Sequence, residues 1–207
     1  NGLTTTQILG LSATDLAVIT SGQVSGLTST QIGGMTAIQL NSLATSSLTD
    51  LTTSQLSGLT STQIGGIDTT HINALGATAV ADLSSLQLSG LTSTQISGID
   101  TTTFGELTST QLGGLTTLQV QGFSTTDLGA ITLSQLDGVT SSQIGALSSA
   151  QLNSLTTTSI TGLSSLQIQG LTSTQVSNLD AGGFAALSSV QLNGLTTLQV
   201  MGLTSTQ

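Results

Sequence analysis

The chain has 207 residues and no lysine or arginine, so its nine acidic residues leave a formal net charge of −9 at pH 7. Because nucleic-acid binding needs cations to neutralise phosphates, this composition excludes it. The absence of cysteine likewise excludes disulfides, thiolate metal sites and thiol catalysis. Hydrophobic residues make up 36% of the chain and the mean hydropathy is +0.36, so material for a core is present.

A strict eight-residue repeat runs along the whole sequence. Its first apolar slot recurs every eight residues from Leu3 to Leu203, and all 26 members are Leu, Ile, Val, Met or Phe. A second apolar slot follows five residues after the first, from Ile8 to Val200, and its 25 members are Leu, Ile, Val or Phe. No insertion breaks the frame, so the sequence predicts a single continuous repeat solenoid over residues 1–207, with about 26 octads. Since the pattern stops midway at the end, we expect a segment of a longer chain.

The spacing of the apolar slots argues against strands and against one long helix. Slots that lie five and then three residues apart would point to opposite faces of a strand. In a continuous helix, an advance of eight residues would rotate the apolar stripe by about 80° each time. The backbone must therefore change direction within every octad. A β-solenoid is kept as the alternative fold.

The polar slots predict a capped helix in each octad. The residue after the first apolar slot is Thr, Ser or Asp in 24 of 26 octads, and these residues are preferred at helix N-caps. Gln stands three residues later in 18 of 26 octads, which completes a capping box. In the octad Leu27–Gly34, Thr28 is the N-cap and Gln31 its partner. The sequence therefore predicts an α solenoid of one-turn helices, with an aliphatic interior and an exterior of hydroxyls and Gln.

Glycine occupies a fixed place near the end of the octad. It stands two residues after the second apolar slot in 15 of 26 octads, which predicts left-handed helix C-caps. Gly22, Gly182 and Gly183 instead fall within the predicted helices of residues 19–24 and 179–184. We expect local distortions or bends there.

His71 is the only imidazole and occupies the Gln slot of its octad. We expect it to replace Gln in the capping box and to hydrogen-bond back towards Asp68. Any Ser-His-Asp triad or histidine metal site would have to use this one residue, and we expect no enzyme activity and no resident cofactor. The acidic residues match no calcium-loop motif. Weak calcium binding between neighbouring turns or chains stays an alternative. Asp15 and Asp127 take the Gln slot, where a carboxylate near a helix N-terminus is favourable.

Six aliphatic residues at the second helical position, where Thr or Ser is usual, are our candidate self-association contacts. This position is rotated by about 200° from the second apolar slot, so it should face outward. Exposed aliphatic residues at regular spacing are typical of a contact surface, and three of the six recur at intervals of ten octads. Recent duplication with tolerated drift is the alternative explanation. The six candidates are Ile38, Leu86, Leu118, Leu166, Val190 and Leu198.

Runs of Leu-Thr-x-x-Gln-Ile/Val-x-Gly/Ala resemble the octapeptide-repeat regions of very large bacterial secreted or surface proteins, which are adhesin-like or filament-forming. The resemblance covers the whole chain, rests on a short degenerate motif and transfers no site residues. It implies an extracellular or cell-surface location and a role in adhesion or assembly. Single octads, such as residues 171–176, are also similar to the helix-opening segment of plant-pathogen effector repeats. Their DNA binding is not carried over, because this chain has no basic residue.

These observations favour a structural repeat protein that forms the shaft of an extracellular filament or surface assembly. The expected partner is the protein itself, as a homopolymer or a lateral bundle. No apolar run approaches the roughly 18 residues that a membrane span requires, so we expect none. The alternative function is an adhesin stalk or binding module that presents rows of hydroxyls to carbohydrate, mineral or ice.

Overall fold

The computed structural model describes residues 2–203, and within them the chain forms short α-helices and no β-strand. Each complete octad between residues 3 and 202 contributes one helix of four to seven residues. The prediction of an α fold is therefore confirmed, and the β-solenoid alternative has no support in this range. The chain divides into two compact units, residues 1–107 and 108–207, which are described separately.

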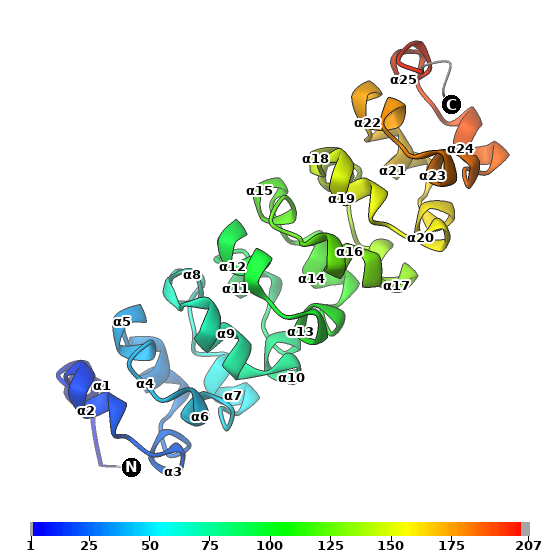
Figure 1. Ribbon diagram of the computed structural model, residues 1–207. Helices are drawn as coiled ribbons and strands as arrows, with labels where there is room; N and C mark the ends of the chain where they lie inside the picture. The colour runs from blue at the N-terminus through cyan, green and yellow to red at the C-terminus, as the bar shows by residue number, and fades with distance from the viewer. Residues whose placement is uncertain (1, 204–207) are drawn as a thin grey trace. The chain divides into compact units, whose positions relative to one another are not determined.

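The helices of each unit follow the octads in order (Figure 1). Those of the first unit are α1 (Thr5–Leu9), α2 (Ala13–Ala17), α3 (Ser21–Val24), α4 (Ser29–Gly34), α5 (Ala37–Leu40), α6 (Thr45–Leu48), α7 (Thr53–Leu56), α8 (Ser61–Gly66), α9 (Thr69–Leu75), α10 (Ala77–Ala81), α11 (Ser85–Leu88), α12 (Ser93–Gly98) and α13 (Thr101–Gly105). Those of the second unit are α14 (Ser109–Gly113), α15 (Thr117–Val120), α16 (Thr125–Ala130), α17 (Leu133–Leu136), α18 (Ser141–Ala146), α19 (Ser149–Asn153), α20 (Thr157–Gly162), α21 (Ser165–Gln169), α22 (Ser173–Ser177), α23 (Ala181–Ala185), α24 (Ser189–Asn193) and α25 (Thr197–Met201).

Within each unit, a helix packs against the third helix further along the chain. In the first unit, α2, α5, α8 and α11 form one such series. In the second unit, α15, α18, α21 and α24 form another. One turn of the repeat therefore takes three octads. Stacked repeats that contact mainly their neighbours are the arrangement of an α solenoid.

Both apolar slots lie inside these stacks. Ile32 and Ile64, from the second slot, are each 0% exposed, and Met35, from the first slot, is 3% exposed. In each octad the first-slot residue directly precedes the N-cap and the second-slot residue follows it by four positions, which is the spacing of a hydrophobic staple. A helix this short is unstable alone, so the stacking of turns has to stabilise it.

Capping boxes open most of the helices, as the sequence predicts. In α8, the Gln63 backbone N–H donates to Thr60 Oγ1 (3.2 Å), and the Thr60 backbone N–H donates to Gln63 Oε1 (2.7 Å). Within residues 2–203 the full box is missing from α6, α9, α10, α13, α16, α20 and α23. Five of these seven helices still have an N-cap side chain that accepts a backbone hydrogen bond. The helices α6 and α10 have none.

The expected exterior position of Gln is wrong for the stacked turns. Gln63 is 6% exposed and Gln143 is 2% exposed. While Gln63 Oε1 serves its own cap, Gln63 Nε2 donates to the backbone oxygens of Ile32 (3.0 Å) and Met35 (2.6 Å) in the preceding turn. Gln143 Nε2 repeats this towards residues 112 (2.8 Å) and 115 (2.7 Å). We call these turn-to-turn bonds the Gln ladder. It satisfies carbonyl groups that the ends of short helices leave without an intrahelical partner.

The expectation of left-handed glycine caps is also wrong. Among the described residues only Gly76 has a positive φ, of 82°; the glycine C-caps of α1, α14 and α21 have right-handed backbones, and the C-caps of α4 and α8 are the extended Met35 and Ile67. Several glycines instead allow neighbouring turns to touch. A Cβ on Gly58 would overlap the backbone oxygen of Ser29, and one on Gly33 would overlap that of Gly58. Glycine is needed there for close approach of two backbones.

The expected distortions at internal glycines do not interrupt the helices. Gly22 lies within α3, which retains a complete capping box. Gly182 and Gly183 lie within α23, where the Gly183 backbone N–H donates to Asp180 Oδ1. The N-cap bond therefore sets these helices despite the lower helix propensity of glycine.

Candidate functional site

The six candidate contact residues all lie on the surface. Their side chains are between 66% and 76% exposed, whereas apolar residues of the two core slots in the stacked turns are nearly all buried. Each stands at the second position of its helix, on the side away from the core, as the helical rotation predicts. Exposure alone does not test self-association, which stays a prediction.

The three-octad turn decides which of these residues share a face. In the second unit Leu118, Leu166 and Val190 belong to α15, α21 and α24, which lie in one packing series. The fourth member of that series, α18, has the exposed Ser142 at the same position. We call Leu118, Leu166 and Val190 the aliphatic row. Its members are 70%, 66% and 68% exposed, so an apolar stripe crosses several turns of one face.

The ten-octad spacing noted in the sequence does not set this alignment. Leu198 follows Leu118 by ten octads, which is not a multiple of the three-octad turn. It belongs to α25, which packs against α22 and therefore lies in a different series. In the first unit, Ile38 and Leu86 lie on α5 and α11, which are six octads and therefore two turns apart in one series. Residues therefore share one face when the spacing between them is a multiple of three octads, which the ten-octad duplication is not.

His71 takes over the turn-to-turn contact of the Gln that it replaces, but the expectation that it replaces Gln in the capping box is wrong, because the Asp68 backbone N–H donates to Asn41 Oδ1 instead. Its Nδ1 lies 2.7 Å from Asp68 Oδ1, as predicted, and its Nε2 lies 3.1 Å from the Leu43 backbone oxygen in the preceding turn. Burial acts to raise the pKa of Asp68, but hydrogen bonds from the His71 ring and backbone, together with the ring charge, outweigh it and lower that pKa. Each ring nitrogen therefore faces an oxygen atom, one in its own octad and one in the preceding turn. This geometry is that of a structural crosslink.

Three asparagines join neighbouring turns at places where the capping box is incomplete. Asn41 Nδ2 donates to the Gly66 backbone oxygen (2.9 Å), and the Asp68 backbone N–H donates to Asn41 Oδ1 (3.0 Å). Asn73 makes the same two bonds at Asp100, and Asn153 does so at Asp180. The octads of these Asp caps have His, Thr or Gly in the Gln slot. Sequence analysis missed this, although each of these Asn residues stands just over three octads before an Asp N-cap.

The stack of helices in the first unit is incomplete at α10. Gly76 and Ala79 occupy the N-cap and Gln slots there, so α10 has neither an N-cap bond nor a Gln side chain. A hollow of about 510 Å³ lies beside them and extends to Leu51. At its rim, Thr53 Oγ1 donates to Asp82 Oδ2 (2.6 Å). Loss of one Gln therefore leaves space in the stack.

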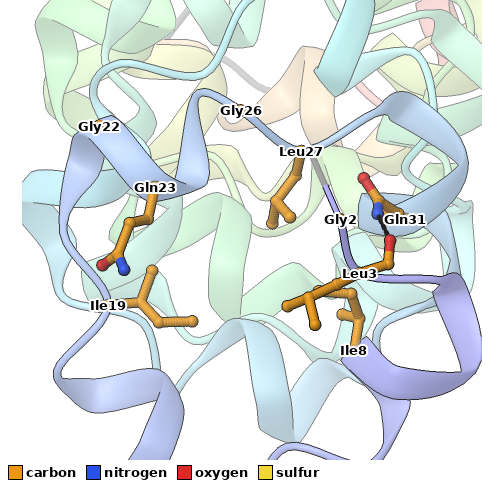
Figure 2. Close-up of a pocket in the computed structure, with 9 residues that line it drawn as sticks. All are labelled: Gly2, Leu3, Ile8, Ile19, Gly22, Gln23, Gly26, Leu27 and Gln31. Carbon is orange, nitrogen blue, oxygen red and sulfur yellow. Dashed lines mark hydrogen bonds between the residues drawn. The ribbon is translucent and has the colours of Figure 1, made fainter.

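A second hollow, of about 350 Å³, lies at the end of the first unit formed by α1 to α3 (Figure 2). Leu3, Ile19 and Leu27 point into it, and the Gln23 amide lies at its edge. Leu3 is 46% exposed, although its counterparts in stacked turns are buried. First-slot side chains, together with Ile8 from the second slot, therefore form the apolar lining of this hollow.

No helix within residues 2–203 combines the length and the apolar character that a membrane crossing demands. Comparisons with protein-family models and with curated proteins found no match to this chain.

Proposed function

We propose that this protein is a structural repeat protein that forms the shaft of an extracellular filament or surface assembly, and that copies of it associate laterally. The aliphatic row of Leu118, Leu166 and Val190 carries the proposal. Exposed apolar side chains that recur along one face, here with Ser142 between Leu118 and Leu166, are typical of an association surface. The extracellular location rests on the resemblance of the octapeptide repeat alone.

The hydrogen bonds between stacked turns support a structural role. Each Gln of the ladder joins its own cap to the preceding turn, as Gln167 does through bonds to the Leu136 (2.8 Å) and Val139 (2.7 Å) oxygens. Because each turn is hydrogen-bonded to the next, stretching the stack would break many bonds together. Repeat stacks of this kind gain stability from every added neighbour interface.

Replacing the aliphatic row tests the lateral contact. The triple variant Leu118→Ser/Leu166→Ser/Val190→Ser should lose lateral association in sedimentation velocity and negative-stain images while its helical circular dichroism is unchanged. Leu198→Ser is the matched control, because it removes an equally exposed leucine from a different packing series. Equal association by the triple variant and the wild type would contradict the proposal.

A row of hydroxyls supports the alternative function as a binding module. Thr6, Thr30, Ser54 and Thr78 occupy the second helical position of successive helices one turn apart in the first unit, and all are exposed. Such a row could present hydroxyls to carbohydrate, mineral or ice. Saturable retention of isolated chains on a glycan or ice-affinity matrix, lost in Thr30→Ala/Ser54→Ala, would favour this function over the structural one.

A further inference from the structure

The helices that carry the aliphatic row belong to octads without a charged residue. These octads hold α15, α18, α21 and α24 and span residues 115–122, 139–146, 163–170 and 187–194. The other two packing series of the second unit contain Asp127, Asp137 and Asp180. Copies of a chain with a net charge of −9 repel one another, and contact through the uncharged series places no carboxylate within the interface. This face therefore offers no ion pair to a charged ligand and suits a second copy of the same chain.

The row is exposed because of its place in the octad. Leu166 lies on α21, which contacts α18 one turn before it and α24 one turn after it, and Leu166 is still 66% exposed. Leu118 and Val190 hold the same octad position and are 70% and 68% exposed. Stacking of turns therefore leaves these side chains uncovered, and they are available to a partner that approaches from the side.

The helix α18 carries the smallest side chains of the series. Ser142 stands where α15, α21 and α24 have leucine or valine, and Gly145 stands three residues later. A Cβ on Gly145 would overlap the backbone oxygen of Gly170, so the contact between turns keeps this position small. The flanking helices α15 and α21 therefore project further from the stack than α18 does.

We propose that two copies of the chain pair side by side through this series in opposite directions, about a twofold axis between α18 and α21. Neighbouring helices of the series are one turn apart, so reversal places α15 opposite α24 of the partner and α18 opposite its α21. Leu118 then packs against the partner's Val190, and Leu166 packs over the partner's Ser142. This inference rests on the proposed structural role and gives the lateral contact its direction and register.

Side-chain size favours opposite directions over parallel ones. In a parallel pair each residue meets its own copy, so leucine pairs at positions 118 and 166 hold the two surfaces apart where Ser142 meets Ser142. In the reversed pair a leucine always meets a smaller residue, valine or serine, which keeps the two surfaces at a more even separation. Interfaces between proteins pack as densely as their interiors, which requires such an even fit. A twofold contact is also complete with two copies, so the pair has no overall direction.

Exposed carboxamides fit the same arrangement. Each member of the row is followed three residues later by an amide side chain, and residues at this spacing share one side of a helix. The three amides are Gln121, Gln169 and Asn193, and all are exposed. The side chains of Gln121 and Gln169 make no hydrogen bond within residues 2–203. Because an amide is both donor and acceptor, Gln121 can bond to the partner's Asn193, which the reversed pairing places opposite it.

Ser142→Leu separates this register from a merely apolar contact. The added leucine would collide with the partner's Leu166 at two symmetric places, so association measured by sedimentation velocity should weaken by about tenfold. Aliphatic residues at this position of other octads show that the helix accepts the change. Thr126→Leu is the matched control, because it adds the same side chain at the exposed second position of α16 in a different series, and it should leave association unchanged. Tighter association by Ser142→Leu would overturn the register.

Disulfide crosslinking tests the direction, since the chain has no cysteine of its own. A mixture of Leu118→Cys and Val190→Cys should form a crosslinked dimer under mild oxidation. Each variant alone should form none, because the pair would hold its two cysteines three turns apart, beyond the reach of a disulfide. Leu198→Cys, on a different packing series, is the control and should not crosslink to Leu118→Cys.

The outcomes separate this inference from the proposed function. Crosslinks within Leu118→Cys alone and within Val190→Cys alone would overturn the opposite directions while the lateral contact stands. A monomeric wild type at every concentration, with no crosslink in any mixture, would overturn both. Equal crosslinking in every combination, the Leu198→Cys control included, would show random collision and would overturn the pairing.

Discussion

The Gln side chain gives this repeat its turn-to-turn bonds because one amide carries both an acceptor and a donor. Its Oε1 closes the capping box, a function that Glu could also perform. Its Nε2 reaches two carbonyl groups of the preceding turn, which Glu could not do. The Gln slot contains 18 Gln and no Glu. That preference was the sequence signal for buried amides, and it is more specific than a capping box alone requires.

Gln63→Glu should therefore destabilise the protein even though its capping box survives. The change removes a donor to the Ile32 and Met35 oxygens and buries a carboxylate beside them, which should cost roughly 2–4 kcal/mol. Urea unfolding measures this. Gln7→Glu is the matched control, because Gln7 is exposed and its Nε2 has no acceptor within residues 2–203; its effect should stay within about 0.5 kcal/mol. Similar losses in the two variants would contradict the ladder.

Stability should also decrease in acid through the Asp68 carboxylate. Hydrogen bonds from His71 lower the pKa of Asp68 in the folded protein, against the opposing effect of burial. The folded state therefore binds this proton less readily than the unfolded chain, in which the pKa of Asp is about 3.9. Its contribution is complete above that value and is lost as the pH falls through the lowered folded-state pKa.

Urea unfolding of the wild type and of Asp68→Asn between pH 7 and pH 2 tests this. The variant should be less stable near neutral pH, and the difference should shrink on acidification. Asp15, whose pKa is lowered by hydrogen bonds from Ser12, should add a similar dependence in both proteins. A stability difference that does not change with pH would exclude the Asp68 carboxylate as its source.

Each short helix is set by its own octad, which is why the helices could be predicted from the sequence. The N-cap slot, the staple and the Gln slot all act within one octad. The number of octads in a turn could not be predicted from these slots, because octads of similar sequence stack equally well in several registers. Residues that occur in only some octads select one of these registers. Gly33 touches Gly58 across a turn, and Asn41 reaches Asp68 in the same way. Both pairs are separated by slightly more than three octads.

Glycine pairs of this kind should be sensitive to any side chain. Gly58→Ala would force a methyl group against the Ser29 backbone oxygen and separate two turns, which should cost about 1–3 kcal/mol. The matched control is Gly22→Ala, a helical glycine with nothing within 4 Å of its Cβ position. That change should instead stabilise by about 0.5–1 kcal/mol, since Ala has the higher helix propensity. Thermal unfolding compares them, and a neutral Gly58→Ala would show that the turns are not in close contact.

Each unit as a whole depends on the same contact made at every turn. The aliphatic interior was predicted correctly, because the two apolar slots are invariant in character. The exterior was predicted only in part: the outward aliphatic residues are exposed, but Gln belongs inside. The expectation of one continuous solenoid over residues 1–207 stays a prediction, since it concerns contacts along the full length. Exposed residues form a row when they are separated in the sequence by a whole number of three-octad turns. The ten-octad duplication does not align them.

Nuclear Overhauser contacts from the Gln side-chain amides test the turn-to-turn ladder most directly. We expect the Nε2 protons of Gln63 to contact residues 32 and 35, and those of Gln143 to contact residues 112 and 115, with slow exchange against solvent. The Nε2 protons of Gln23 should exchange rapidly in the monomer. Gln amides that contact only their own octads and exchange as fast as free glutamine would contradict the account.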